Sequence, residues 1–173
     1  MKKTAVESVC EELVFAGFFK AHVKPLRNFL YYKFGNDEQA NDAAQEAFMK
    51  LWENCGSVPL AKARSYIYKV AGNATLNVIA HQKVVLEYAK SANPVQHTSE
   101  SPEFILEEQQ FKTKLERAIQ NLTEAQRTAF LLHRIDGKKY AEIAEMLDIS
   151  IKAVEKRIHG ALVSLRLEIE NIK

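Results

Sequence analysis

The chain has 173 residues, which is enough for one medium domain or two small helical ones. Apolar residues make up 47% of it, which excludes global disorder, and the formal net charge of +2 means that any nucleic-acid binding must come from local basic patches. No apolar run reaches the length of a membrane span and no signal peptide is visible, so we expect a cytoplasmic protein. Few glycines and prolines, and no alternating β-branched runs, favour an all-α fold.

The cysteines and histidines give no sign of a metal site. Cys10 and Cys55 lie far apart in the sequence, without ligand spacing, so we expect two reduced thiols and neither a disulfide nor a zinc site. The five histidines also lack metal-ligand spacing, and there is no Gly-rich phosphate loop or nucleophile motif. We therefore predict a protein that is not an enzyme and needs no cofactor.

Three helical runs precede a polar segment. They are expected at about 6–33, 38–52 and 61–81, the last possibly reaching residue 88, and Pro25 is expected to divide or kink the first. Residues 35–37, Gly-Asn-Asp, form a turn. Residues 90–102, KSANPVQHTSESP, have no apolar periodicity and are interpreted as a linker.

A helix-turn-helix is predicted near the carboxyl end. A helix at 103–121 is followed by one that Thr123 caps, with Gln126 completing a capping box and Gly137 ending it. In residues 138–166, Asp148 stands at a corner, where its side chain tolerates left-handed backbone, and Ser150 caps the next helix. Apolar residues then follow at spacings of four, four and three, with polar residues outside: Val154, Ile158, Leu162 and Leu165. This pattern indicates a DNA-binding motif, although an ordinary helical hairpin in a core remains the alternative.

The stretch from Asn54 to Leu86 contains four basic residues and no acidic one. An acid-free surface suits a phosphate backbone, because any carboxylate there would repel it. Chance together with a buried helix is the other explanation, but the interleaved Tyr66 and Tyr68 favour nucleic acid.

Three motifs resemble a known family. Residues 42–52, DAAQEAFMKLW, resemble region 2.2 of bacterial sigma factors, residues 64–73, RSYIYKVAGN, resemble the start of regions 2.3 and 2.4, and residues 101–166 resemble region 4. The order of these motifs, without regions 1.1 and 3, is similar to that of extracytoplasmic-function (ECF) sigma factors. The resemblance implies two helical domains, a region 2 domain at 1–89 and a region 4 domain at 103–173, joined by the linker at 90–102.

The resemblance also implies a polymerase-binding face on the second helix. Its members are Asp42, Gln45, Glu46 and Met49, which are expected to dock on the β′ clamp helices of core RNA polymerase, while the β flap is a further expected contact. A merely solvated polar face is the alternative.

Region 2 of the family binds the −10 promoter element as single-stranded DNA, with short polar groups for base edges and lysines for phosphates. The corresponding residues here are Lys62, Arg64, Ser65, Tyr66, Lys69, Asn73, Asn77 and His81. Tyr66, where the family has Trp, is equally well interpreted as a core anchor. Asn77 and Ala80 replace a frequent Asp and Arg of the family, which leaves the −10 preference open.

Region 4 of the family reads the −35 element as duplex in the major groove. The residues implied are Arg134, Lys139, Ser150, Lys152, Ala153, Lys156 and Arg157. For Arg134 and Lys139 plain surface charge is as good an explanation, and Gly160 stands where the family usually has Arg.

By this resemblance the sequence is identified as a member of the ECF-type sigma factors, with core polymerase, promoter DNA and an anti-sigma factor as expected partners. Two other classes remain: a free-standing helix-turn-helix regulator, and an interaction protein that sequesters a partner. The first predicts tight duplex binding without polymerase, and the second leaves the acid-free stretch unexplained.

Overall fold

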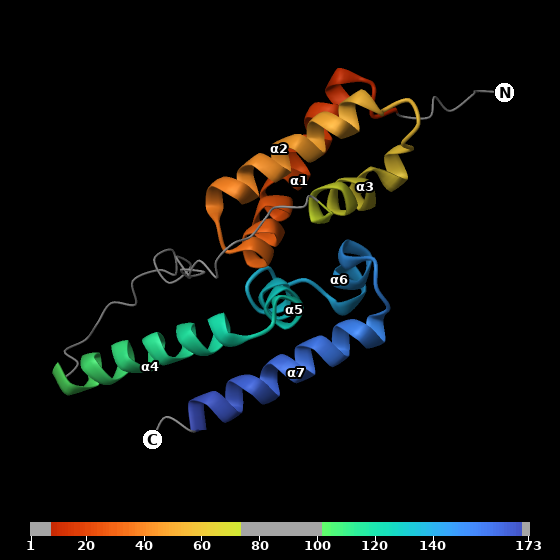
Figure 1. Ribbon diagram of the computed structural model, residues 1–173. Helices are drawn as coiled ribbons and strands as arrows, with labels where there is room; N and C mark the ends of the chain where they lie inside the picture. Colours follow the sequence, from red (N-terminus) through yellow and green to blue (C-terminus); the bar gives the residue numbers. More distant parts are fainter. Residues whose placement is uncertain (1–7, 74–101, 171–173) are drawn as a thin grey trace.

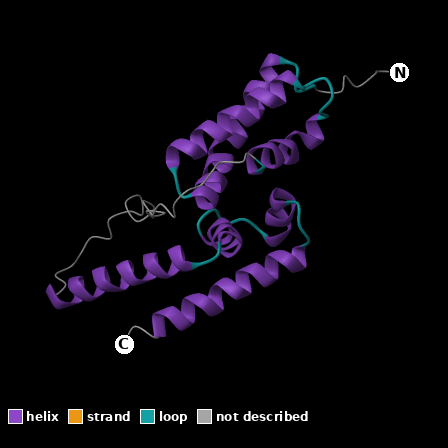
Figure 2. Ribbon diagram, in the orientation of Figure 1, coloured by secondary structure: helices purple, strands orange, loops and turns teal. Residues whose placement is uncertain are grey.

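The structure is a computed structural model that describes residues 8–73 and 102–170. Within these two ranges it contains seven helices and no strand, so the all-α prediction is confirmed (Figure 2). None of the helices in these ranges is long and apolar enough to cross a membrane. The helices are α1 (Glu12–Phe34), α2 (Asp37–Glu53), α3 (Leu60–Gly72), α4 (Pro102–Asn121), α5 (Glu124–Arg134), α6 (Tyr140–Leu147) and α7 (Ile151–Glu170).

The first lobe is built from α1, α2 and α3. α1 is one helix that runs through Pro25, and it ends at Gly35, whose φ of 71° is left-handed. Asn36 then caps α2 by accepting a hydrogen bond from the Gln39 backbone N–H at 2.9 Å. This tight turn makes α1 and α2 antiparallel neighbours, and α3 packs against both. The largest of the fully buried side chains in this lobe are Leu26, Leu30, Leu51 and Ile67.

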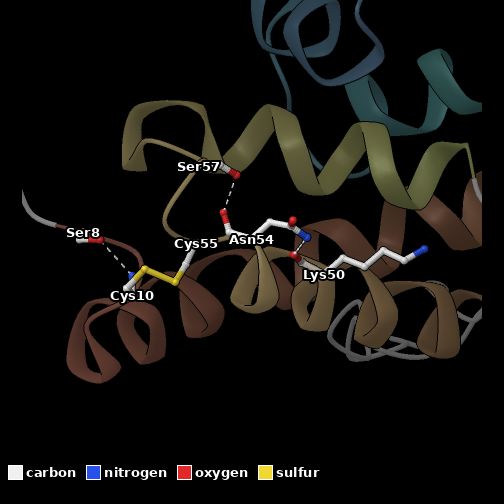
Figure 3. Close-up of a disulfide and its surroundings, with 6 residues drawn as sticks. All are labelled: Ser8, Cys10, Lys50, Asn54, Cys55 and Ser57. Atoms are coloured by element: carbon white, nitrogen blue, oxygen red, sulfur yellow. Dashed lines mark hydrogen bonds between the residues drawn. A yellow bond between two sulfur atoms is a disulfide. The ribbon is translucent and has the colours of Figure 1, made fainter.

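The expectation of two reduced thiols is wrong in this structure. Cys10 and Cys55 form a disulfide with a Cα–Cα distance of 5.1 Å (Figure 3). The antiparallel packing of α1 and α2 is the cause, because it brings the segment just before α1 beside the segment just after α2. A separation of 45 residues in sequence therefore becomes direct contact in the fold.

The second lobe consists of α4–α7. Thr123 and Gln126 form the predicted capping box of α5, with the Thr123 hydroxyl and the Gln126 amide oxygen each accepting a backbone hydrogen bond. α7 packs against α4, α5 and α6. The core of the lobe holds Leu131, Leu132, Ile143 and Val154, each no more than 1% exposed.

The corner between α6 and α7 has the predicted conformation. Asp148 adopts the left-handed region, with φ 53° and ψ 47°, and ends α6. The Ile149 N–H donates to the Ala144 carbonyl at 3.0 Å, which closes the turn. Ser150 Oγ accepts from the Ala153 N–H at 3.2 Å, so Ser150 caps α7 as expected.

The two lobes are in contact (Figure 1). α5 lies against α1, and α6 lies against α3. Across this junction the Arg127 Nε donates to the Tyr32 carbonyl at 3.2 Å, in a buried position. The predicted linker, residues 90–102, lies outside the described residues except for Pro102, where α4 begins. The division at 89 and 103 therefore stays a prediction.

Candidate nucleic-acid and polymerase interfaces

The polar face predicted on α2 is open to solvent. Asp42, Gln45, Glu46 and Met49 are all exposed, whereas the opposite face of the helix is buried among α1 and α3. Glu46 pairs with Lys50 at 2.6 Å, one turn further along, and this exposed ion pair contributes little stability. The helix is therefore anchored by its alanine-rich inner face, and its outer face is available for a partner.

An apolar groove lies beside this face, between α1 and α2, and was not predicted. Phe15 packs edge-on against Trp52, with ring centroids 4.9 Å apart, and Phe19 packs against Phe48 at 4.8 Å. Met49 and Trp52 remain 62% and 44% exposed. Gln45 lines the groove as well. A contiguous exposed apolar patch of this kind is typical of a surface that binds another protein. The sequence does contain an indication of this groove. Phe residues stand at 15, 18 and 19, and together they provide more apolar surface than one buried helical face needs.

Four of the predicted −10 residues lie along one exposed face of α3 and its carboxyl-terminal cap, Asn73. They lie at helical spacings of three, four and four, which stacks their side chains along the helix. Arg64 is half-buried beside this face. The four exposed residues are Lys62, Ser65, Lys69 and Asn73. Asn77 and His81 lie outside the described residues.

The two tyrosines of α3 have different environments. Tyr66 is half-buried at the edge of a cleft, so one part of its ring is in the core and another part is accessible. Tyr68 is 2% exposed and packs on Phe29 with ring centroids 5.3 Å apart. Burial raises the pKa of the Tyr68 phenol far above its ordinary value, so the hydroxyl stays neutral. Tyr68 is thus a core residue, whereas Tyr66 is placed for both roles considered.

A lysine that was not predicted as a site residue lies at the carboxyl end of α3. Lys33, from the last turn of α1, donates through Nζ to the Gly72 carbonyl at 2.6 Å. This contact satisfies one of the free carbonyls at the helix end and places a positive charge beside Asn73. Lys33 lines the same cleft as Lys62 and Lys69.

The predicted −35 residues lie at the start of α7 and around α6. Lys152 and Lys156 are exposed, Ala153 and Arg157 are half-buried, and Ser150 holds the helix terminus. The exposed basic residues that flank α6 are Arg134 and Lys139. The first turns of α7 therefore present lysines outward from a helix whose inner face is fixed by Val154 and Ile158.

Close packing explains why a glycine stands at position 160, where the family usually has arginine. A Cβ built on Gly160 would lie 2.8 Å from the Gln126 Nε2 atom. Gln126 is the residue that completes the capping box of α5. The glycine thus lets α7 approach the amino end of α5 closely while the box remains intact.

One cleft of about 830 Å³ is lined by residues of both lobes. From the first lobe it takes the predicted −10 residues Lys62, Ser65, Tyr66, Lys69 and Asn73. From the second lobe it takes Arg157 together with the acidic Glu124, Glu145 and Asp148. Lys152 and Lys156 are not among its lining residues. Among the described residues, no group of His, Cys, Asp and Glu could hold a metal ion.

Comparison with known proteins gives matches to both lobes. Residues 18–84 match the family Sigma-70 region 2, and residues 112–165 match Sigma-70, region 4. The chain is 26% identical over 168 residues to the ECF RNA polymerase sigma factor SigW of Bacillus subtilis, covering 91% of this chain and 90% of that protein. It is 25% identical to the ferric citrate uptake sigma factor FecI of Escherichia coli, covering 87% of each. It is 26% identical to the RNA polymerase sigma factor CarQ of Myxococcus xanthus, covering 88% of this chain and 87% of that protein.

Proposed function

Because this chain belongs to the sigma-70 family and has the two-region plan of the ECF sigma factors, we propose that it binds core RNA polymerase and directs promoter recognition and transcription initiation. The observation that carries this proposal is the presence of both regions, in order, on one chain that aligns with the SigW protein over nearly its whole length. A helix-turn-helix alone would be compatible with many kinds of regulator.

We assign polymerase binding to the outer face of α2. Asp42, Gln45, Glu46 and Met49 are exposed, and the neighbouring apolar groove offers Trp52 as an aromatic anchor of the kind that dominates protein interfaces. The proposed contact for this surface is the β′ clamp helices. The β flap is proposed to contact the second lobe, where Leu162, Val163 and Leu167 of α7 are exposed.

We assign −10 binding to the exposed face of α3 and −35 binding to the first turns of α7. On α3, lysines for phosphates alternate with Ser65 and Asn73, whose side chains can hydrogen-bond base edges. On α7, Lys152 and Lys156 project where a recognition helix meets the major groove. Strand separation would be driven by binding energy, since captured unpaired bases offset the cost of unstacking.

The protein's partners in this role are core polymerase in the cytoplasm, promoter DNA and an anti-sigma factor. The role itself is one of binding and not of catalysis.

A binding experiment with purified core polymerase tests the proposal. We expect saturable binding by the wild type and a loss of at least about tenfold in affinity for a Gln45→Ala, Glu46→Ala double variant, which corresponds to about 1.4 kcal/mol for two truncations within the proposed contact surface. Glu38→Ala is the matched control, since Glu38 is an exposed acid in the first turn of the same helix. Absence of core binding together with tight, polymerase-independent binding to duplex DNA would instead support a free-standing regulator.

A further inference from the structure

The disulfide joins the two helices that form the apolar groove of the first lobe. Cys10 lies just before α1, and Cys55 lies just after α2 (Figure 3). Phe15 of α1 and Trp52 of α2 line the groove near these two cysteines in sequence, and their rings pack edge-on with centroids 4.9 Å apart. The covalent bond therefore ties together the two walls of the groove beside this ring pair.

The first turn of α1 is held weakly apart from this bond. Glu11, the N-cap residue, makes no side-chain hydrogen bond to the helix, and Leu13 in the first turn is 89% exposed. Val9 is buried just before the helix, and the disulfide adds a second fixed point. Loss of the bond should therefore loosen the opening turn, and with it the packing of Phe15 on Trp52, before it affects the buried core.

The two sulfurs differ in their exposure. Cys10 is exposed, whereas Cys55 is half-buried and packs against the hydrophobic core. An exposed disulfide is open to attack by external thiols, and such bonds are the more easily reduced ones. Disulfides in cytoplasmic proteins are usually redox-sensing or catalytic and not permanent. A subunit of bacterial RNA polymerase works in that compartment.

We propose that Cys10 and Cys55 are a site of oxidative modification by thiol–disulfide exchange, and that their bond orders the groove between α1 and α2 for binding to core polymerase. The reduced protein keeps its fold but has a looser groove, so it binds core more weakly. Oxidising conditions thereby favour the polymerase-bound state. For the compartment and for polymerase as the partner, the inference rests on the proposed function.

The exchange is balanced with a small-molecule disulfide such as oxidised glutathione. The Cys10 thiolate attacks one sulfur of the oxidant, which forms a mixed disulfide and releases one glutathione thiolate. The Cys55 thiolate then attacks the Cys10 sulfur, which forms the protein disulfide and releases the second glutathione thiolate. The two protein thiols give up two electrons, which reduce the S–S bond of the oxidant, and two protons, which end on the released thiolates.

Glutathione buffers of increasing oxidised fraction, equilibrated with the full chain, test the site directly. Free thiols are trapped with N-ethylmaleimide and counted by mass spectrometry. We expect conversion from two trapped thiols to none within the range of these buffers. Cys55→Ser should carry one glutathione on the exposed Cys10, whereas Cys10→Ser should take up glutathione on the half-buried Cys55 much more slowly. A bond that persists in the most reducing buffer, or thiols that stay unpaired in the most oxidising one, would overturn the proposal.

The fluorescence of Trp52 reports on the groove without polymerase, because Trp52 is the single tryptophan of the chain. We expect reduction to shift its emission to longer wavelength, since the ring becomes more accessible to water, while the helical signal in circular dichroism stays nearly constant. The Cys10→Ser, Cys55→Ser variant should show the emission of the reduced state with or without reductant. Unchanged emission on reduction contradicts the proposal. Loss of the helical signal does so as well, because the bond would then hold the whole lobe together.

Titration with core polymerase separates this inference from the proposed function. We expect the reduced wild type and the double serine variant to bind core about tenfold more weakly than the oxidised wild type, because two interface side chains must then be ordered on binding. Equal affinities of the oxidised and reduced protein overturn the redox control and leave the sigma function standing. If neither form binds core, the proposed function fails, and with it polymerase as the partner, while a shift of the Trp52 emission still supports a groove ordered by oxidation.

Discussion

Reduction of the Cys10–Cys55 disulfide should destabilise the first lobe markedly. The bond closes a loop with a sequence separation of 45 residues that contains the whole of α1 and α2. The chain-entropy relation for a loop of this length gives about 4 kcal/mol at 25 °C, lost when the bond opens. For a protein of ordinary stability this is a large share of the free energy of unfolding.

Urea denaturation followed by circular dichroism, with and without reductant, measures this effect. We expect a lower midpoint in reductant and an equally low midpoint for the Cys10→Ser, Cys55→Ser variant in either condition. Adding reductant to that variant is the control, because it has no disulfide to lose. Amide exchange should become faster first in the opening turns of α1, which the bond ties to the end of α2 (Figure 3). A difference below about 1 kcal/mol between oxidised and reduced protein would refute the reasoning, since it would mean that the bond barely restricts the unfolded chain.

Three further changes have predictable outcomes. Ile67→Ala, at a fully buried position of α3, should lower the free energy of unfolding by about 2–5 kcal/mol in urea titration. Gly160→Ala should stabilise the protein by less than the roughly 1 kcal/mol expected from helix propensity, because the new Cβ displaces Gln126, and the full gain should return in a Gln126→Ala background. Burial, followed by the charges of Arg64 and Lys138, lowers the pKa of His22 below 6.5, so protonation of His22 opposes folding. The free energy of unfolding should therefore fall as the pH drops from 6.5 through that lowered pKa. Thermal melts of His22→Gln should lack this part of the pH dependence. An NMR titration that gives His22 a pKa above 6.5 would contradict the predicted pH dependence.

Local signals in the sequence were sufficient for the second lobe. The capping box at Thr123, the left-handed corner at Asp148 and the cap at Ser150 depend on residues within four positions of one another, so a single sequence specifies them. The exposed face of α2 followed from helical periodicity in the same way. Pro25 was expected to divide or kink the first helix, but α1 continues through it as one helix.

The features that were missed depend on contacts between distant segments. Nothing near Cys10 or Cys55 indicates their pairing, which arises only when α1 and α2 pack antiparallel. Nothing near Asp136 in the sequence indicates that it contacts α1, which lies about 100 residues earlier in the chain. The contact between the lobes, and the cleft lined by five predicted −10 residues together with Arg157, could not be predicted because no local pattern encodes how two lobes dock.

The most direct test of the central claim is transcription in vitro with core polymerase and this protein on sheared DNA of the source genome. We expect transcripts with discrete start sites that appear only when the protein is added. A Lys152→Ala, Lys156→Ala variant should reduce them, while Arg166→Ala, an exposed change further along the same helix, should have much less effect. Discrete start sites that are identical with and without the protein, or none at all despite core binding, would contradict the assignment of this chain as a sigma factor.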